Sequence, residues 1–244
     1  MGAAALNYSE TIECHGVKVP VVAQIVTPRL QRAMRKNRYE EGEFKALSKM
    51  LKPDDRVVDI GAGVGLISAV AAKIVGPANV VAVEANPQMV PMIQETHAVN
   101  GVTGVEVLNG VGVTRPGGKN VPFYLHENFW SSTMNEKRGT GEGYVGQTEV
   151  PEIDLNDLLA RHRPTVMTVD IEGAELTLFD DLETTSLRSI SMEMHPRFYG
   201  RGGCAHIMAT LMKRGFVYDC RLSPGGSVVV LTRFRRRIAS VAEL

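Results

Sequence analysis

A glycine-rich turn between an apolar strand and an apolar helix most constrains how this chain can fold. Two valines at 57–58 lead into the turn Asp59-Ile-Gly61-Ala-Gly63-Val-Gly65, and apolar residues at helical spacing follow over 65–74. Glycines permit positive φ and let backbone amides approach a ligand without a Cβ in the way. Such a turn at the carboxyl end of a strand is typical of an open α/β sheet that binds a nucleotide-like ligand.

Short apolar runs alternate with helical patterns along most of the chain, which predicts βαβ units and a parallel sheet. Further strands of this sheet are expected at 79–84, 105–109, 166–170 and 189–194. Helices are expected at 86–100, 155–160, 172–180 and 205–213. The last two strands, 216–220 and 228–231, flank Ser223-Pro-Gly-Gly and predict an antiparallel hairpin. The predicted fold is α/β, with a Rossmann-like, mostly parallel sheet that ends in this hairpin.

The length of 244 residues suits one substantial α/β domain. We expect this domain at 51–235, preceded by an N-terminal extension at 1–50 that covers the cofactor and followed by a basic tail at 236–244. In the extension, 14–22 predicts a short hairpin at a sheet edge, and 27–34 and 40–51 predict helices. Arg233 and the arginines at 235–237 are expected to form a solvated end.

The alternation is interrupted over 110–150. Strand-like pieces at 121–125 and 147–150 surround a polar, glycine-rich loop at 135–146, and no helical pattern is found between them. Long loops inside compact domains are often functional. We therefore expect an insertion here, with 139–146 acting as a lid over the site.

The composition limits the partners and the compartment. Lys and Arg number 27, as do Asp and Glu, so the net charge is zero. This balance argues against nucleic acid as a partner and fits a neutral or small polar substrate better. Three widely spaced cysteines indicate a reducing compartment, and the sequence shows neither a signal peptide nor an apolar run of membrane-spanning length. We expect a cytoplasmic protein without a membrane partner; a homodimer stays open.

The identity of the ligand depends on the spacing of the glycines. A dinucleotide-binding turn has the pattern GxGxxG, which requires glycine at position 66, where this chain has Leu66. The form found here, with Asp59 two residues ahead of Gly61, resembles motif I of class I methyltransferases, which bind S-adenosylmethionine. Glu84 ends the next strand, where a carboxylate can accept hydrogen bonds from both ribose hydroxyls. Proteins that bind nicotinamide dinucleotides use the same contact, so Glu84 alone does not discriminate.

Three segments resemble the FkbM-type methyltransferase family: Val57-Val-Asp-Ile-Gly-Ala-Gly-Val-Gly, Val83-Glu-Ala-Asn-Pro and Val169-Asp-Ile-Glu-Gly-Ala-Glu. The resemblance covers about residues 39–218. It implies S-adenosylmethionine-dependent methylation, usually at a hydroxyl of a sugar, polyketide or other small metabolite. One departure is Gly63, where the family usually has asparagine.

The resemblance and the turn together predict the cofactor contacts. Tyr39-Glu40 matches a Tyr-Glu pair that tends to precede the first core helix in the family, and it would cover the cofactor from the extension. The predicted cofactor-binding residues are Tyr39, Glu40, Asp59, Gly61, Gly63, Gly65, Glu84, Ala85, Asn109 and Gly110.

Acidic residues and a histidine follow the next two strands of the sheet. Asp170 and Glu172 come after the fourth strand, Glu175 follows one helical turn later, and Glu193 and His195 end the fifth. For Glu172 and Glu175, an acid in the first helical turn that complements the helix dipole is the alternative interpretation. His195 is a candidate general base whose pKa neighbouring carboxylates would raise. Alternatively, Asp170, Glu193 and His195 could hold a divalent metal that orients and acidifies a hydroxyl. Both mechanisms stay open on the sequence.

The substrate side is expected in the insertion, where Trp130, Ser131 and Ser132 combine an aromatic ring with hydroxyls. The leading hypothesis is an O-methyltransferase acting on a small metabolite. Methylation of nitrogen or carbon is an open alternative, because the shape of the pocket determines the acceptor atom. Leu66 argues against a third alternative, a nicotinamide-dependent oxidoreductase.

Overall fold

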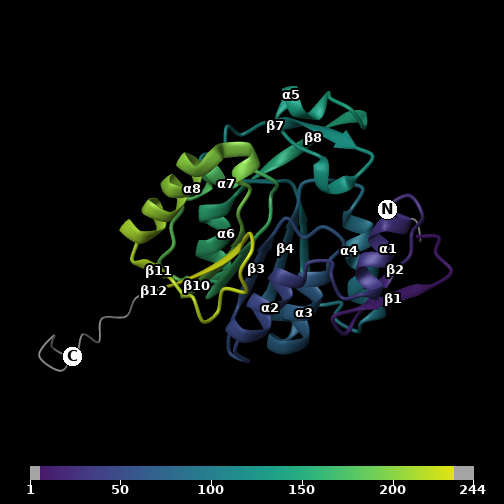
Figure 1. The fold of residues 1–244 in the computed structure, drawn as a ribbon, viewed down its shortest axis with the longest axis horizontal. Helices are drawn as coiled ribbons and strands as arrows, with labels where there is room; N and C mark the ends of the chain where they lie inside the picture. Colours follow the sequence, from purple (N-terminus) through teal and green to yellow (C-terminus); the bar gives the residue numbers. More distant parts are fainter. Residues whose placement is uncertain (1–5, 234–244) are drawn as a thin grey trace, which may run out of the picture.

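A seven-stranded sheet forms the centre of the computed structural model, which describes residues 6–233 (Figure 1). The strand order is β11-β12-β10-β9-β3-β4-β5. Strand β12 pairs antiparallel with both β10 and β11, and every other pairing in this sheet is parallel. The predicted mostly parallel sheet with a C-terminal antiparallel hairpin is therefore confirmed. The strands are β3 (Val57–Ile60), β4 (Val80–Glu84), β5 (Glu106–Asn109), β9 (Val166–Val169), β10 (Ser189–Glu193), β11 (Phe216–Tyr218) and β12 (Val228–Arg233).

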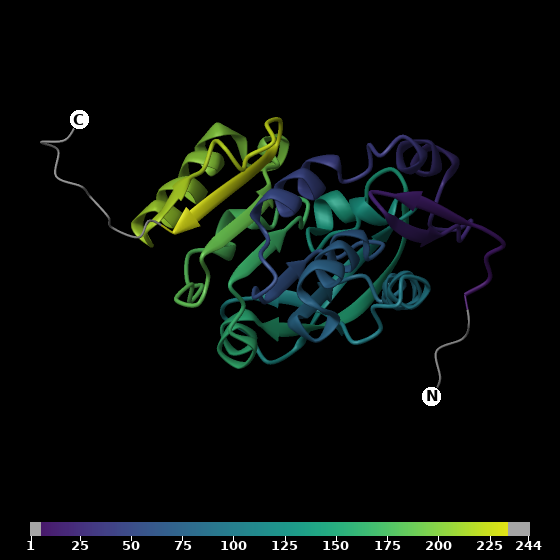
Figure 2. The same cartoon turned by 90° about the horizontal axis from the view of Figure 1, so that it is seen from below.

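Helices cover both faces of the sheet (Figures 1 and 2). Successive strand residues point to opposite faces, so Val57 belongs to one core cluster and Val58 to the other. The first cluster lies under α2 (Glu41–Met50), α3 (Leu66–Val75) and α4 (Val90–Val99). The second lies under α6 (Leu155–His162), α7 (Glu175–Leu178) and α8 (Pro196–Lys213). A short 3-10 turn, η1 (Pro77–Asn79), joins α3 to β4.

The N-terminal hairpin does not extend the main sheet. Its strands β1 (Thr11–Cys14) and β2 (Val17–Pro20) form a separate two-stranded sheet that packs beside α3 and α4, at the end of the molecule away from β11 and β12 (Figure 1). Its buried side chains join the core cluster of those helices. The prediction of a hairpin is right, but its expected place at a sheet edge is wrong. Helix α1 (Pro28–Arg35) follows, capped by the Thr27 side chain.

The insertion forms a small sheet of its own in the order β6-β8-β7, seen above the main sheet in Figure 1. Its elements are β6 (Val111–Val113), β7 (Asn120–His126), η2 (Phe129–Ser131), α5 (Glu136–Gly139) and β8 (Tyr144–Asp154). The expectation of no helix is wrong, because Asn135 caps one turn by accepting a hydrogen bond from the Arg138 amide. Part of the lid expected at 139–146 belongs to a strand, because β8 begins at Tyr144.

Several helix boundaries differ from the prediction. The helix expected at 172–180 is reduced to α7, because Glu172 (φ 53°) and Gly173 (φ 105°) are left-handed and interrupt the ladder. Helix α8 starts nine residues earlier than expected and is kinked at Gly200. Helix α4 starts at Val90 rather than Pro87. Here the Asn86 side chain accepts from the Gln88 amide in a local turn instead.

The expected solvated C-terminal end is wrong for its first residue. The Arg233 guanidinium donates 2.9 Å hydrogen bonds to the carbonyls of Leu187 and Arg214, and it lies 4.5 Å from the centre of the Phe216 ring. The arginines at 235–237 lie outside the described residues. Within 6–233, no helix combines the length and the apolar character needed to cross a bilayer.

Candidate active site

A cavity of about 1170 Å³ opens where β3, β4, β9 and β10 end. The glycine turn lines one side, and residues 38–43 and the insertion line the others. Most of the residues predicted from the sequence face this space. They are Tyr39, Glu40, Gly61, Gly63, Glu84, Ala85, Gly110, Trp130, Ser132, Asp170, Glu172 and Glu193.

Some predicted residues are not part of the cavity wall. Gly65 begins α3, and a Cβ on it would come within 3.0 Å of the Ile93 Cα. The close packing of α3 against α4 therefore explains why this position is a glycine. Ser131 lies in η2 beside the lining residues. Asp59, Asn109 and His195 also lie behind the wall and support residues that form it.

Gly61 places the turn directly against the end of β9. Its amide donates a 2.9 Å hydrogen bond to the Val83 carbonyl, and its φ is 89°. A Cβ here would lie 1.8 Å from the carbonyl oxygen of Asp170, which no side-chain rotation can relieve. The bare backbone thus allows β3 and β9 to converge beneath the cavity.

The backbone of Gly63 is exposed to the cavity. Its φ is 55°, and a Cβ here would look toward the Tyr39 hydroxyl at 3.4 Å, Glu40 Oε1 at 3.6 Å and the Phe129 ring at 3.6 Å. The Tyr-Glu pair predicted to cover the cofactor therefore lies across from the turn.

Glu84 is buried at the end of β4. Its Oε2 accepts a 2.9 Å hydrogen bond from the Gly63 amide, and its Oε1 accepts one of 2.8 Å from the Asn86 amide. Burial raises the pKa of Glu84 to about 7, although these amides favour the ionised form. Each oxygen keeps a further lone pair for a ligand hydroxyl. Asn109 supports the strand end by donating to the carbonyls of Glu84 (2.8 Å) and Ala85 (3.1 Å).

Asp59 lies beneath the turn. Its Oδ1 accepts a 2.6 Å hydrogen bond from the Thr168 hydroxyl, and among the described residues its buried Oδ2 has no partner. Burial raises the pKa of Asp59 to about 6. With Glu40, Glu43 and Asp170, it lines a second hollow of about 20 Å³ under the cavity. Four carboxylates thus gather on the inner side of the site.

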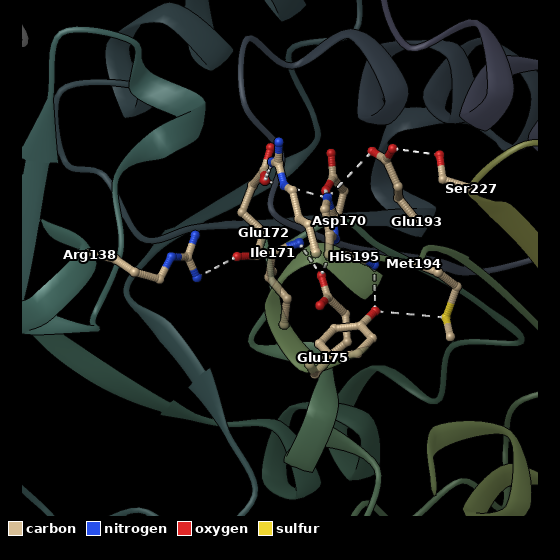
Figure 3. Close-up of polar contacts among 11 residues, drawn as sticks. Arg138, Asp170, Ile171, Glu172, Glu175, Glu193, Met194, His195 and Ser227 are labelled. Atoms are coloured by element: carbon tan, nitrogen blue, oxygen red, sulfur yellow. Dashed lines mark hydrogen bonds and ion pairs between the residues drawn. The ribbon is translucent and has the colours of Figure 1, made fainter. Parts of the chain in front are cut away.

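His195 lies at the centre of the acidic residues that follow β9 and β10 (Figure 3). Its Nδ1 is 3.1 Å from Glu175 Oε1, an oxygen that also accepts from the Ile171 amide. Its Nε2 faces Glu172 at 3.4 Å, Asp170 at 3.6 Å and Glu193 at 3.8 Å. His195 is 5% exposed, and Asp170, Glu172 and Glu193 stand between it and the cavity. A substrate in the cavity would therefore meet these carboxylates before the imidazole.

Burial and mutual repulsion control protonation in this cluster. Burial, followed by the charges of Glu193 and Glu172, raises the pKa of Asp170 well above its usual range. Burial likewise raises the pKa of Glu43 to about 7. For His195, burial lowers the pKa, but the hydrogen bond to Glu175 and the surrounding carboxylates outweigh it, so the net shift is upward. The cluster therefore favours bound positive charge.

Sequence reasoning missed one acidic member of this group, Glu43. Glu43, on α2, has a carboxylate oxygen within 4.8 Å of those of Asp170 and Glu193. The i,i+3 spacing between Glu40 and Glu43 was the available signal, because it places both on one helix face. Glu175 is a candidate in the sequence that an acid in the first helical turn explains equally well, and in the structure it is fully buried and contacts the His195 ring.

A basic residue of the insertion, Arg138, also went unnoticed. It donates to the Glu172 carbonyl at 3.0 Å and stacks 3.4 Å from the centre of the Phe198 ring. This contact ties α5 to α8 across the mouth of the site. Its sequence signal is weak, because a lone arginine in a polar loop usually lies in solvent.

The family model of the methyltransferase FkbM domain matches residues 59–218. The chain belongs to this family. This assignment confirms the resemblance noted in the sequence, which is to a family of methyltransferase domains and not to nicotinamide-dependent oxidoreductases.

Individual relatives are more distant. The ribosomal protein L11 methyltransferase of Clostridium perfringens (strain SM101 / Type A) is 41% identical over 66 residues, which are 27% of this chain and 21% of that protein. The chain thus matches about a fifth of the length of this curated relative. The crystal structure of M. jannaschii TYW2 in complex with AdoMet is 16% identical, with a TM-score of 0.50 over 95% of this chain and 89% of that one. This likeness confirms the Rossmann-like fold. The precorrin-6y C5,15-methyltransferase of Geobacter metallireducens aligns with a TM-score of 0.45 at 17% identity, over 80% and 88% of the two chains.

Proposed function

We propose that this chain transfers a methyl group from S-adenosylmethionine to a hydroxyl of a small metabolite. The observation that carries the proposal is that Gly63, Glu84 and Asp170, from three different strand ends, all face one cavity. The first two suit the cofactor, and the third suits an acceptor placed beside its methyl group.

The charge around the turn fits this cofactor. When bound, S-adenosylmethionine supplies an electrophilic methyl carbon on a positively charged sulfur, and it also carries an ammonium group. Glu40 and Asp170 line both the cavity and the hollow under the turn, where they can balance such positive charge. A pyrophosphate near Gly63 would instead approach the Glu40 carboxylate, since a Cβ at Gly63 would already be 3.6 Å from its Oε1. Burial raises the pKa of Glu40 well above its usual range, so a bound cation would stabilise the ionised form of Glu40, whereas a pyrophosphate would oppose it.

Glu84 and the glycine turn would hold the nucleoside end of the cofactor. Each Glu84 oxygen already accepts one backbone amide, which fixes the carboxylate so that its remaining lone pairs can receive the two ribose hydroxyls. Tyr39 and Phe129, on the opposite side of Gly63, would exclude water from the bound cofactor.

Asp170 would accept the proton of the acceptor hydroxyl. As the hydroxyl oxygen forms a bond to the methyl carbon, the carbon–sulfur bond breaks and its electron pair stays on sulfur. The raised pKa of Asp170 makes its ionised form a stronger base than an ordinary aspartate, and the positive charge of a bound S-adenosylmethionine would favour that ionised form. His195 would act as a positioning residue, because it contacts Asp170 from behind and Glu175 fixes its ring.

A small uncharged acceptor fits the inner end of the cavity best. An acceptor atom must enter among Asp170, Glu172 and Glu193, where a phosphate would be repelled. Trp130 and Ser132 line the wall and offer an aromatic edge and a hydroxyl to a sugar-like or cyclic molecule. A relative that matches part of this chain is named as a ribosomal protein methyltransferase. The test below therefore includes macromolecular acceptors.

The test measures transfer of a labelled methyl group from S-adenosylmethionine to pooled hydroxylated metabolites, amines, ribosomal protein and RNA. We expect label in a hydroxylated small molecule. Asp170→Asn should lower kcat by about 100-fold or more, with the dissociation constant of S-adenosylhomocysteine changed by about twofold at most. Asp157→Asn, an exposed change on α6, serves as the control.

Each other outcome overturns a defined part of the proposal. Label only in an amine or at carbon would establish the alternative acceptor atoms, and label only in RNA or protein would refute the small-molecule acceptor. Full turnover in Asp170→Asn would refute its role as the proton acceptor.

A further inference from the structure

The geometry points to a divalent cation bound between the His195 imidazole and the carboxylates of Asp170 and Glu193, at the inner end of the cavity. Its role in catalysis rests on the proposed methyl transfer, but its binding does not. A cation there would contact an acceptor hydroxyl and acidify it.

The first observation is the orientation of His195. His195 is 5% exposed, and its Nδ1 contacts Glu175 Oε1 at 3.1 Å, which fixes the orientation of the ring. Its Nε2 is then directed at carboxylate oxygens of Glu172, Asp170 and Glu193. Positive charge held between these groups would stabilise this arrangement.

The second observation is the spacing around Nε2. Asp170 Oδ1 and Glu193 Oε2 lie 3.6 and 3.8 Å away, beyond the usual range of about 2.7–3.2 Å for a hydrogen bond. Two ligands each about 2.1 Å from one ion lie about 3.0–3.4 Å apart at right or tetrahedral angles. The three groups are therefore too distant to bond one another directly, and small side-chain rotations bring them to the spacing of a coordination shell.

The third observation is a carboxylate oxygen without a partner. Among the described residues, Asp170 Oδ1 is buried and accepts no hydrogen bond. Asp170, Glu43 and Glu193 also offer oxygens within 4.8 Å of one another, so Glu43 of α2 can complete the site. Glu172 is left out, because its Oε2 already pairs with Arg197 at 2.6 Å.

This arrangement favours Mn²⁺ or Mg²⁺. Carboxylates are the preferred ligands of these ions, and in this set they outnumber the single imidazole. With one oxygen of Asp170 on the ion, the other can still accept the acceptor's proton, so the cation and the proposed proton transfer are compatible. Glu175 would act as the partner that orients the histidine ligand, as in many carboxylate–histidine–metal sites.

The test titrates Mn²⁺ into the full chain without S-adenosylmethionine and follows free Mn²⁺ by electron paramagnetic resonance. We expect one saturable site, with binding weakened about tenfold or more in Asp170→Asn and Glu193→Gln. Glu183→Gln removes an exposed carboxylate elsewhere and should bind Mn²⁺ as the unmodified chain does. Circular dichroism melts verify that each variant is folded. If Asp170→Asn is unfolded, Glu43→Gln replaces it as the second variant of a ligand residue.

Absence of a saturable site would overturn the proposal and leave His195 as an imidazolium that neutralises the carboxylates. Mn²⁺ affinity unchanged in Glu193→Gln would equally overturn it. Binding of S-adenosylhomocysteine measured in the presence of a chelator separates this proposal from the methyltransferase function, because each measurement can fail without the other.

Discussion

Replacing Gly61 with alanine tests whether the bare backbone of the turn is what allows the strands to converge. The added Cβ would lie 1.8 Å from the Asp170 carbonyl oxygen, and the φ of 89° is itself unfavourable for alanine. Left-handed backbone costs a non-glycine residue about 1–2 kcal/mol. Overpacking a rigid contact costs a further 1–3 kcal/mol or so. We therefore expect a loss of about 2–5 kcal/mol in the free energy of unfolding, which is roughly 5–20 °C in Tm for a chain of this size.

Gly101→Ala provides the matched control. Its φ of 71° is also left-handed, but a Cβ there meets no atom within 4 Å, so only the backbone cost of about 1–2 kcal/mol applies. Unfolding in urea gives the stability of both variants, and calorimetry gives their affinity for S-adenosylhomocysteine. Gly61→Ala should also bind at least about tenfold more weakly, because relieving the clash moves the turn. Equal stability and equal affinity in the two variants would refute the steric argument.

Two further predictions concern buried ionisable groups. Burial raises the pKa of Asp55, but hydrogen bonds from Arg188 and Thr165 outweigh it, so the folded pKa lies below the usual 3.8. Ionised Asp55 therefore stabilises the fold above pH 3.8, and this stabilisation is lost as the pH falls through the folded pKa. Asp55→Asn should lower the free energy of unfolding in urea by about 3–5 kcal/mol at pH 7. A loss under 1 kcal/mol or so would contradict this. Burial lowers the pKa of His97 to about 4, so the folded protein favours the neutral ring. The free energy of unfolding that His97 contributes should therefore fall as the pH drops from 6.5 toward 4. The stability difference between the chain and His97→Gln, measured across that window, tests this, and a constant difference would count against it.

Local sequence determined the elements around the cofactor turn. Strand β3, the turn and α3 follow from a buried valine pair, three glycines and apolar residues at helical spacing, all within 20 residues of the chain. The carboxyl ends of parallel strands meet at one edge of a sheet, so the alternation alone was enough to bring Glu84 and Asp170 to the same cavity. These features depend on short-range periodicity and on chain topology, which a sequence carries directly.

Tertiary contacts decided what the local pattern could not. Glu43 reads as a solvated acid on an N-terminal helix, and only the packing of α2 against β10 and β12 brings it to Asp170. The sequence leaves Glu175 open between a catalytic candidate and an acid at a helix start, and only the tertiary structure shows that it is buried beside His195. His195 was expected in the cavity but lies behind the carboxylates. In each case the protonation and the role of a side chain depend on neighbours distant in sequence, because burial and charge act through space.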